Sequence, residues 1–149
     1  MKAIIFDFNR TIYDPESNKL HEGALKCLRD LSNDYSLFLV AKGKEERKML
    51  IKSLKIEKFF KFISVLEEKS LQQFSDCQQA LNLETEWYVV GDRTRKEIKY
   101  GNQCNMITIW FKDGKFAEEL PNDDDENPKY IINNLSQIKK IVKGDAGTD

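Results

Sequence analysis

The stretch KAIIFDFNRT, residues 2–11, is the most informative part of the sequence, because a short apolar run ends there in an aspartate. The run KAIIFD is consistent with a buried strand. Asp7 ends it, and a charge at that point is costly unless it is paired or bound to a metal. Asn9 stands two places further on. The stretch therefore predicts a polar site at the end of a strand and raises the question of what Asn9 does there.

The same pattern recurs along the chain, with apolar runs separated by single segments of helical periodicity. We expect strands at 2–7, 35–41, 61–66, 86–92 and 105–111 and a sixth, short strand in 129–134, with helices in 21–32, 44–56, 70–83 and 94–103 and after residue 134. Strands that alternate with single helices predict an α/β fold, a three-layer αβα sandwich around a central parallel sheet. We assign residues 1–143 to one domain and 144–149 to a disordered tail.

Bulk composition restricts the classes of function. The 24 Lys and Arg residues nearly balance the 25 Asp and Glu residues, so the charge gives no support for a nucleic-acid partner. No apolar stretch approaches the roughly 20 residues that span a bilayer, and the first apolar run is too short for a signal peptide. The cysteines, Cys27, Cys77 and Cys104, are widely spaced and read as reduced thiols of a cytoplasmic protein. A catalytic thiol would need His21, the only histidine, as its base, which we disfavour.

The residues that follow the strands are the candidates for chemistry, since ligands of open parallel sheets bind beyond the carboxyl ends of the strands. Asp7 and Asp92 both end apolar runs, so the topology brings them to one edge. Two carboxylates there repel each other, and Mg²⁺ held by oxygen ligands relieves the repulsion. The alternative for each aspartate is that it caps a turn. The pair together favours a metal site.

Lys69 follows the third strand and precedes the next helix, which Ser70 and Gln73 begin as a capping box. The helix dipole disfavours a cation at this position and favours an anion. Lys69 therefore predicts an anion site, and the alternative is a solvent-exposed lysine.

These residues, in this order, resemble the haloacid dehalogenase-like (HAD) phosphohydrolase superfamily from Ile4 to about Leu135. The family's first motif, D-x-D-G-T, reads Asp7-Phe8-Asn9-Arg10-Thr11 here. Its second motif falls on Ala41, followed by Lys42 and Gly43, its third on Lys69, and its fourth on Gly91-Asp92 through Glu97. The resemblance rests on order and spacing, because no single one of these motifs is highly specific.

The resemblance implies a role for each matching residue. Asp7 is the nucleophile that forms an aspartyl-phosphate, and Mg²⁺ is held by Asp7, the main-chain oxygen of Asn9, and Asp92. Lys69 neutralises the phosphoryl oxygens. Glu97 orients a metal-bound water, or, as an equal alternative, serves only in a capping box that starts at Thr94.

Three departures from the family pattern bear on activity. Asn9 replaces the aspartate that acts as general acid and base, help worth about 10²–10⁴ in rate. Arg10 replaces a glycine and either reaches a substrate anion or points to solvent. Ala41 lacks the hydroxyl that binds phosphate, for which the amides of Lys42 and Gly43 could partly substitute. We therefore expect weak activity on unactivated esters.

The leading hypothesis is a Mg²⁺-dependent phosphohydrolase that prefers activated phosphates. The alternative is a catalytically impaired module that binds phosphate or a protein. A response-regulator receiver ranks last, because Glu67 and Glu68 stand where its acceptor aspartate would follow the third strand. No segment is long enough for a cap domain, which argues against dehalogenation and implies an open site for a large phosphorylated substrate or one closed by a second subunit, as in a homo-oligomer. We expect the acidic stretch 121–128 to be a solvated connection, since it lacks a calcium-loop pattern.

Overall fold

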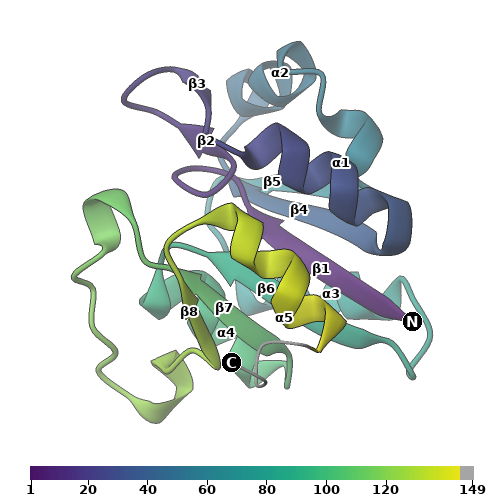
Figure 1. The fold of residues 1–149 in the computed structure, drawn as a ribbon, viewed down its shortest axis with the longest axis vertical. Coiled ribbons are helices and arrows are strands. Elements are labelled where there is room, and N and C mark those ends of the chain that lie inside the picture. Colours follow the sequence, from purple (N-terminus) through teal and green to yellow (C-terminus); the bar gives the residue numbers. More distant parts are fainter. Residues whose placement is uncertain (145–149) are drawn as a thin grey trace.

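A parallel sheet of six strands forms the centre of the molecule (Figure 1). The computed structural model describes residues 1–144, so positions 145–149 of the expected tail lie outside the described residues. The strands lie in the order β5-β4-β1-β6-β7-β8 and all neighbours are parallel. Their bounds are β1 Lys2–Asp7, β4 Ser36–Lys42, β5 Phe62–Leu66, β6 Glu86–Gly91, β7 Ile107–Phe111 and β8 Tyr130–Ile132. All six predicted strands are confirmed, with shifts of one or two residues at some ends.

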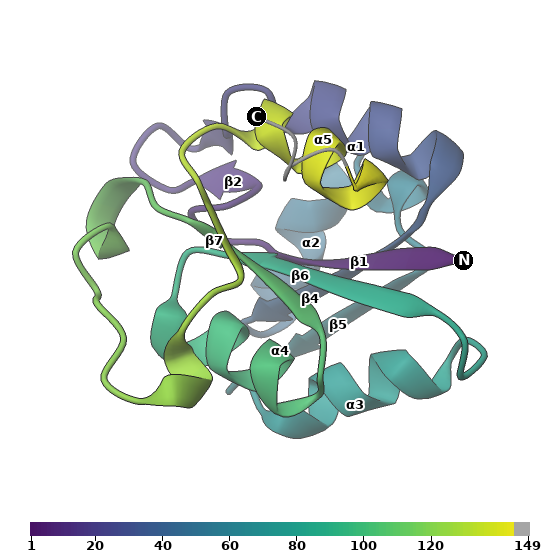
Figure 2. The same ribbon diagram turned by 60° about the horizontal axis from the view of Figure 1, so that its bottom comes forward.

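Helices cover both faces of the sheet, which confirms the predicted three-layer arrangement (Figure 2). One layer holds α1 (Ala24–Asp34), α2 (Glu45–Ser53) and α5 (Ile138–Lys143). The other layer holds α3 (Leu71–Gln79) and α4 (Lys99–Gln103). Short helical turns add η1 Glu57–Phe59, η3 Gly114–Phe116, η4 Asp124–Glu126 and η5 Leu135–Gln137, and a π-helical turn, η2 Thr94–Ile98, leads into α4.

The sheet separates two hydrophobic cores, and β1 contributes to both. Ile4 and Phe6 belong to the larger core, under α1, α2 and α5, whereas Ala3 and Ile5 belong to the smaller one with α3. Successive side chains of a strand point to opposite faces. A central strand that is covered on both faces must therefore be apolar at every position, which explains the unbroken run that precedes Asp7.

Nothing larger than a hairpin or one helix interrupts the fold at the two places where a cap would be inserted in residues 1–144. The hairpin β2 (Tyr13–Asp14) and β3 (Lys19–Leu20) lies between β1 and α1, and α3 alone lies between β5 and β6. No helix among these residues combines the length and apolarity needed to cross a membrane.

Gly101 lets α4 approach the sheet closely, and this provides a test of packing. A Cβ atom at Gly101 would lie 2.7 Å from Thr108 Cγ2 and 2.9 Å from Val89 Cγ2. We expect Gly101→Ala to lower the free energy of unfolding by about 1–3 kcal/mol through overpacking, although the better helix propensity of alanine offsets part of this. Urea denaturation measures the change, and the exposed Gln79→Ala should stay within about 0.5 kcal/mol of wild type. Equal stability of Gly101→Ala and wild type would contradict the close approach.

Candidate active site

Four strands end at one edge of the sheet and line a cleft of about 380 Å³. Asp7 ends β1, Lys69 follows β5, and Asp92 follows β6, and all three line this cleft. The edge forms because β4 and β6 flank β1 in parallel, so that the three carboxyl ends face the same way. The predicted convergence of these segments is thus present in the structure.

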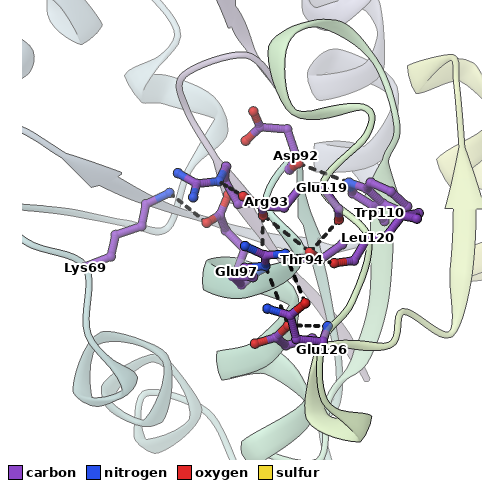
Figure 3. Close-up of polar contacts among 11 residues, drawn as sticks. Lys69, Asp92, Arg93, Thr94, Glu97, Trp110, Glu119, Leu120 and Glu126 are labelled. Carbon is purple, nitrogen blue, oxygen red and sulfur yellow. Dashed lines mark hydrogen bonds and ion pairs between the residues drawn. The ribbon is translucent and has the colours of Figure 1, made fainter.

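Lys69 points into the carboxylates of the cleft. Its Nζ atom donates a hydrogen bond to Asp7 Oδ1 and lies 3.3 Å from Glu97 Oε2, the second contact being visible in Figure 3. The side chain is only 10% exposed, so the alternative of a solvent-exposed lysine is wrong. Burial acts to lower the pKa of Lys69, but the charges of Asp7 and Glu97 outweigh it and raise the pKa above its ordinary value. Lys69 is therefore a fixed positive charge at the floor of the cleft.

Asp7 is the carboxylate that this lysine keeps ionised. Burial acts to raise the pKa of Asp7, yet the Lys69 charge and the hydrogen bonds of the site outweigh burial and hold that pKa below its ordinary range. Thr11 Oγ1 donates to Asp7 Oδ2 at 3.3 Å and orients the carboxylate from the other side. An ionised, oriented carboxylate at the floor of an open cleft can act as a nucleophile.

Asp92 and Glu97 crowd the same place and lack enough positive charge to balance them. Asp7, Asp92 and Glu97 can each offer an oxygen within 4.8 Å of the others, and all three are buried. Burial, followed by the charge of Asp7, raises the pKa of Asp92 to about 10 and that of Glu97 to about 8. Three carboxylates thus face one lysine.

The donor set of this cluster fits a hard divalent cation. Both carboxylate oxygens of Glu97 and the Oδ1 atom of Asn9 are buried and accept no hydrogen bond from residues 1–144. Buried oxygens that accept no hydrogen bond are costly, and a cation would satisfy those of Glu97. All the candidate ligands are oxygens, the type that Mg²⁺ prefers.

The structure decides between the two interpretations of Glu97. Thr94 belongs to the π-helical turn η2, and its Oγ1 atom donates to the Glu119 carbonyl oxygen at 2.8 Å. The Glu97 side chain instead enters the cleft and packs against Gly91. A Cβ atom added at Gly91 would lie 2.7 Å from Glu97 Cβ, so only glycine leaves room for Glu97. The capping-box interpretation of Thr94 and Glu97 is therefore wrong.

The second motif, Ala41 to Gly43, offers fewer free groups for binding phosphate than its sequence predicts. The Ala41 side chain is buried in the larger core and does not line the cleft. The Gly43 amide, expected to help bind phosphate, already donates to the Leu66 carbonyl oxygen at 2.9 Å. Lys42 does line the cleft, with its Nζ atom 3.6 Å from Glu68 Oε1. The Gly43 amide is thus not free to bind phosphate, whereas Lys42 and Gly43 both line the cleft.

Arg10 occupies the glycine position of the first motif and keeps a glycine-like backbone, with φ of 64°. A left-handed conformation costs a non-glycine residue about 1–2 kcal/mol. The guanidinium lies 3.3 Å from Glu16 Oε1 and 5.7 Å from the ring centre of Phe116, at the mouth of the cleft. Arg10 therefore does not simply point to solvent. Whether it contacts a substrate anion stays a prediction.

Several cleft residues escaped the sequence prediction. Thr11, Arg47, Arg93, Lys96 and Phe116 touch Asp7 or line the cleft. Thr11, Arg93 and Lys96 lie inside the motifs and could have been included on that ground. Arg47 and Phe116 carry no local signal, because only folding brings α2 and the segment after β7 to this edge.

The acidic stretch 121–128 is more than a solvated connection. Glu126 is buried, accepts a hydrogen bond from the Asn122 amide at 2.8 Å and lies 3.9 Å from Arg95 Nε. Just before this stretch, Glu119 accepts a hydrogen bond from Arg93 Nε at 2.9 Å (Figure 3). These contacts hold the segment after β7 against η2 and so fix one wall of the cleft.

The crowded carboxylates predict a pH-dependent stability of the metal-free protein. The pKa values of Asp92 and Glu97 are raised in the folded state, so both groups contribute fully to folding stability below about pH 4. The stability from Glu97 is lost as the pH rises toward 8, and that from Asp92 as the pH rises toward 10. The lowered pKa of Asp7 and the raised pKa of Lys69 add no slope between pH 5 and 8. We expect stability to fall across that range by up to about 1.4 kcal/mol per pH unit for each group.

Urea denaturation with EDTA at pH 5 to 8 measures this slope. Asp92→Asn should flatten it and raise stability at pH 8, while the exposed Asp34→Asn should leave it unchanged. Mg²⁺ should stabilise wild type and flatten the slope, and should do neither in Asp92→Asn. A slope that is the same in Asp92→Asn and wild type would show that these carboxylates do not interact as described.

Comparison with known proteins finds a family model that matches part of the chain and several similar proteins. Residues 70–138 match the model of the family described as HAD-hydrolase-like. A glyceraldehyde 3-phosphate phosphatase of Pyrococcus furiosus is 28% identical over 137 residues, which cover 85% of this chain and 56% of that protein. A glyceraldehyde 3-phosphate phosphatase of Methanocaldococcus jannaschii is 41% identical over 54 residues, 36% of this chain and 22% of that protein. The chain therefore spans about half, or less, of the length of these relatives.

Solved structures share the fold at low sequence identity. The HAD-family protein YfnB of Bacillus subtilis, solved with magnesium, superimposes with a TM-score of 0.80 at 14% identity and covers 95% of this chain and 98% of that chain. A 2-haloacid dehalogenase of Pseudomonas syringae has a TM-score of 0.68 at 20% identity over 85% of this chain and 54% of that chain. The sheet and the arrangement of its helices are those of the HAD-like class. The fold and the match of residues 70–138 agree with the resemblance to the haloacid dehalogenase-like hydrolase superfamily that the motifs indicated.

Proposed function

We propose that this chain is a Mg²⁺-dependent phosphohydrolase that acts through an aspartyl-phosphate on Asp7. One observation carries the proposal: a buried aspartate, kept ionised by Lys69, stands at the floor of an open cleft beside two further carboxylates. Structural ion pairs seldom gather three buried acids around one lysine, because the excess charge is costly. The phosphatase relatives support the same class of reaction.

Asp7 would attack phosphorus through a carboxylate oxygen, and the leaving group would depart with the electron pair of the broken P–O bond. This splits one difficult displacement into two easier steps. Lys69 would stabilise negative charge on the phosphoryl oxygens, and Thr11 would hold the carboxylate in its orientation. Water would then release phosphate from Asp7.

Mg²⁺ would be held by Asp7, Asp92, Glu97 and the main-chain oxygen of Asn9. When bound, it supplies the positive charge that lets an anionic nucleophile approach an anionic phosphate. The oxygen-only donor set supports this choice of ion, as do the Glu97 oxygens, which accept no hydrogen bond from residues 1–144. The magnesium bound to YfnB supports it by analogy of fold.

Asn9 determines which phosphates the site favours. An amide cannot deliver a proton to a departing alkoxide, whereas aryl or acyl phosphates leave without one. We therefore propose activated phosphates as the preferred substrates, carried by molecules large enough to fill an open cleft. Glyceraldehyde 3-phosphate, the substrate named for the relatives, belongs in the test set, although this chain spans only about half of their length.

A binding module without turnover is the second candidate, and the second motif favours it. Ala41 offers no hydroxyl, and the Gly43 amide is already bonded within the sheet. Together with Asn9, these features weaken both phosphate binding and proton transfer. Such a protein would bind Mg²⁺ and phosphate but release nothing.

Phosphate release from an aryl phosphate tests the proposal. We expect wild type to release phosphate with Mg²⁺ and not with EDTA. Lys69→Met should lower this rate about 10²–10³-fold, because the substitution removes a fixed positive charge at the reacting group. The exposed Lys52→Met, on α2, should keep the wild-type rate. If the protein binds Mg²⁺ but releases phosphate from neither the aryl phosphate nor glyceraldehyde 3-phosphate, the binding module is favoured instead.

A further inference from the structure

The cleft carries more positive charge at its rim than one reacting phosphate requires. Its lining includes the cations Arg10, Lys42, Arg47, Lys69, Arg93 and Lys96 and the acids Asp7, Glu68, Asp92 and Glu97. Four of the cations pair with carboxylates: Lys69 with Asp7 and Glu97, Lys42 with Glu68, Arg10 with Glu16 and Arg93 with Glu119. Arg47 and Lys96 have no carboxylate within 4.0 Å among residues 1–144.

Arg47 is held in place although it has no ionic partner within residues 1–144. Its side-chain stem packs on Gly43, where an added Cβ would come within 2.5 Å of Arg47 Cβ. Its guanidinium lies 5.0 Å from the ring centre of Phe8, in the geometry of a cation–π contact. A half-buried guanidinium that is positioned by packing and faces a cleft is ready to bind an anion bidentately.

Arg47 and Lys69 reach the cleft from opposite layers. Arg47 belongs to α2, which covers the face of the larger core. Lys69 precedes Ser70, the N-cap of α3, and α3 covers the other face (Figure 2). Phe8, beneath the guanidinium, belongs to the larger core, whereas Asp7, the preceding residue, pairs with Lys69. Arg47 thus contacts Phe8 while Lys69 contacts Asp7, and an anion on Arg47 would be distinct from the phosphate that Lys69 would hold.

We propose that the substrate carries a second anionic group, a carboxylate or another phosphate, and that Arg47 binds it. The proposal rests on the proposed function, since it takes the Asp7–Lys69 floor as the place of the reacting phosphate. Lys96, which has no carboxylate partner in the described part of the chain, comes from η2, after β6, and so stands across β1 from Arg47. Its charge favours dianionic over monoanionic compounds at the same rim. The substrate class is thus narrowed to phosphates with a further acidic group.

Binding of two phosphonates tests this without turnover, because a C–P bond is not hydrolysed by attack on phosphorus. Benzylphosphonate and 4-carboxybenzylphosphonate are titrated into the full chain with Mg²⁺ by calorimetry. We expect wild type to bind the carboxylated compound about tenfold more tightly, as one charge-assisted hydrogen-bonded pair allows. Arg47→Met, which keeps the packing stem, should lose this preference, Arg47→Lys should keep part of it, and the exposed Arg29→Met should keep all of it.

The outcomes separate the two proposals. Equal binding of both phosphonates by wild type, or a preference that survives in Arg47→Met, overturns the second anion site and leaves the phosphohydrolase proposal standing. If Arg47→Met loses affinity for both phosphonates equally, so that the ratio of the two affinities is unchanged, Arg47 contacts the reacting phosphate and the second anion site is overturned. Binding of neither compound by wild type overturns both proposals. Thermal melting of each variant confirms that it is folded.

Discussion

Asp7→Asn is expected to lower phosphate release from an aryl phosphate by at least about 10³-fold. The amide is a poor nucleophile, and loss of a nucleophile removes nearly all of the chemistry that depends on it. The fold should persist, because Lys69 keeps its contact with Glu97 when the charge of Asp7 is removed. The effect should therefore appear in the rate and not in the amount of folded protein.

Release of inorganic phosphate with Mg²⁺, followed at several enzyme concentrations, measures this loss. Asp34→Asn, an exposed aspartate at the end of α1, is the matched control and should keep the wild-type rate. Acid quenching of wild type should also trap a phosphorylated chain, which Asp7→Asn should not form. A rate that is the same in wild type and Asp7→Asn would exclude Asp7 as the nucleophile and with it the proposed mechanism.

Asn9→Asp is expected to raise turnover of an alkyl phosphate by about 10²–10⁴, the usual worth of general acid–base help. The Asn9 side chain lines the cleft, and its Oδ1 atom is buried with no hydrogen-bond partner among residues 1–144. Under the proposed mechanism, a carboxyl group at this position would donate a proton to the leaving group. The gain should be much smaller for an aryl phosphate, whose leaving group needs no proton.

The ratio of alkyl to aryl turnover is the decisive measurement for this variant. Asn133→Asp, an exposed asparagine after β8, adds the same charge away from the cleft and should leave the ratio unchanged. No gain in Asn9→Asp, with Mg²⁺ binding intact, would favour the binding module. Ala41 is kept unchanged in this test, because its side chain is buried in the larger core.

The chain order of apolar runs was enough to predict the fold and the place of the site. A strand buried on both faces is apolar throughout, so β1, β4 and β6 stand out without an alignment. Parallel strands then bring their carboxyl ends to one edge, which predicts that Asp7, Asp92 and Lys69 converge. The capping box at Ser70 was also predictable, because it depends on residues three apart, and the structure confirms it.

Only the tertiary structure decided what depends on contacts between distant segments. The pattern from Thr94 to Glu97 fits a capping box locally, yet contacts of Thr94 with Glu119 and of Glu97 with Lys69 turn the glutamate into the cleft. The Gly43 amide was expected to be free and is bonded to Leu66 on the neighbouring strand. The sequence by itself thus determined the scaffold and the Asp7 floor. The hydrogen-bond and ion-pair partners of these polar groups lie far along the chain, and local patterns do not specify them.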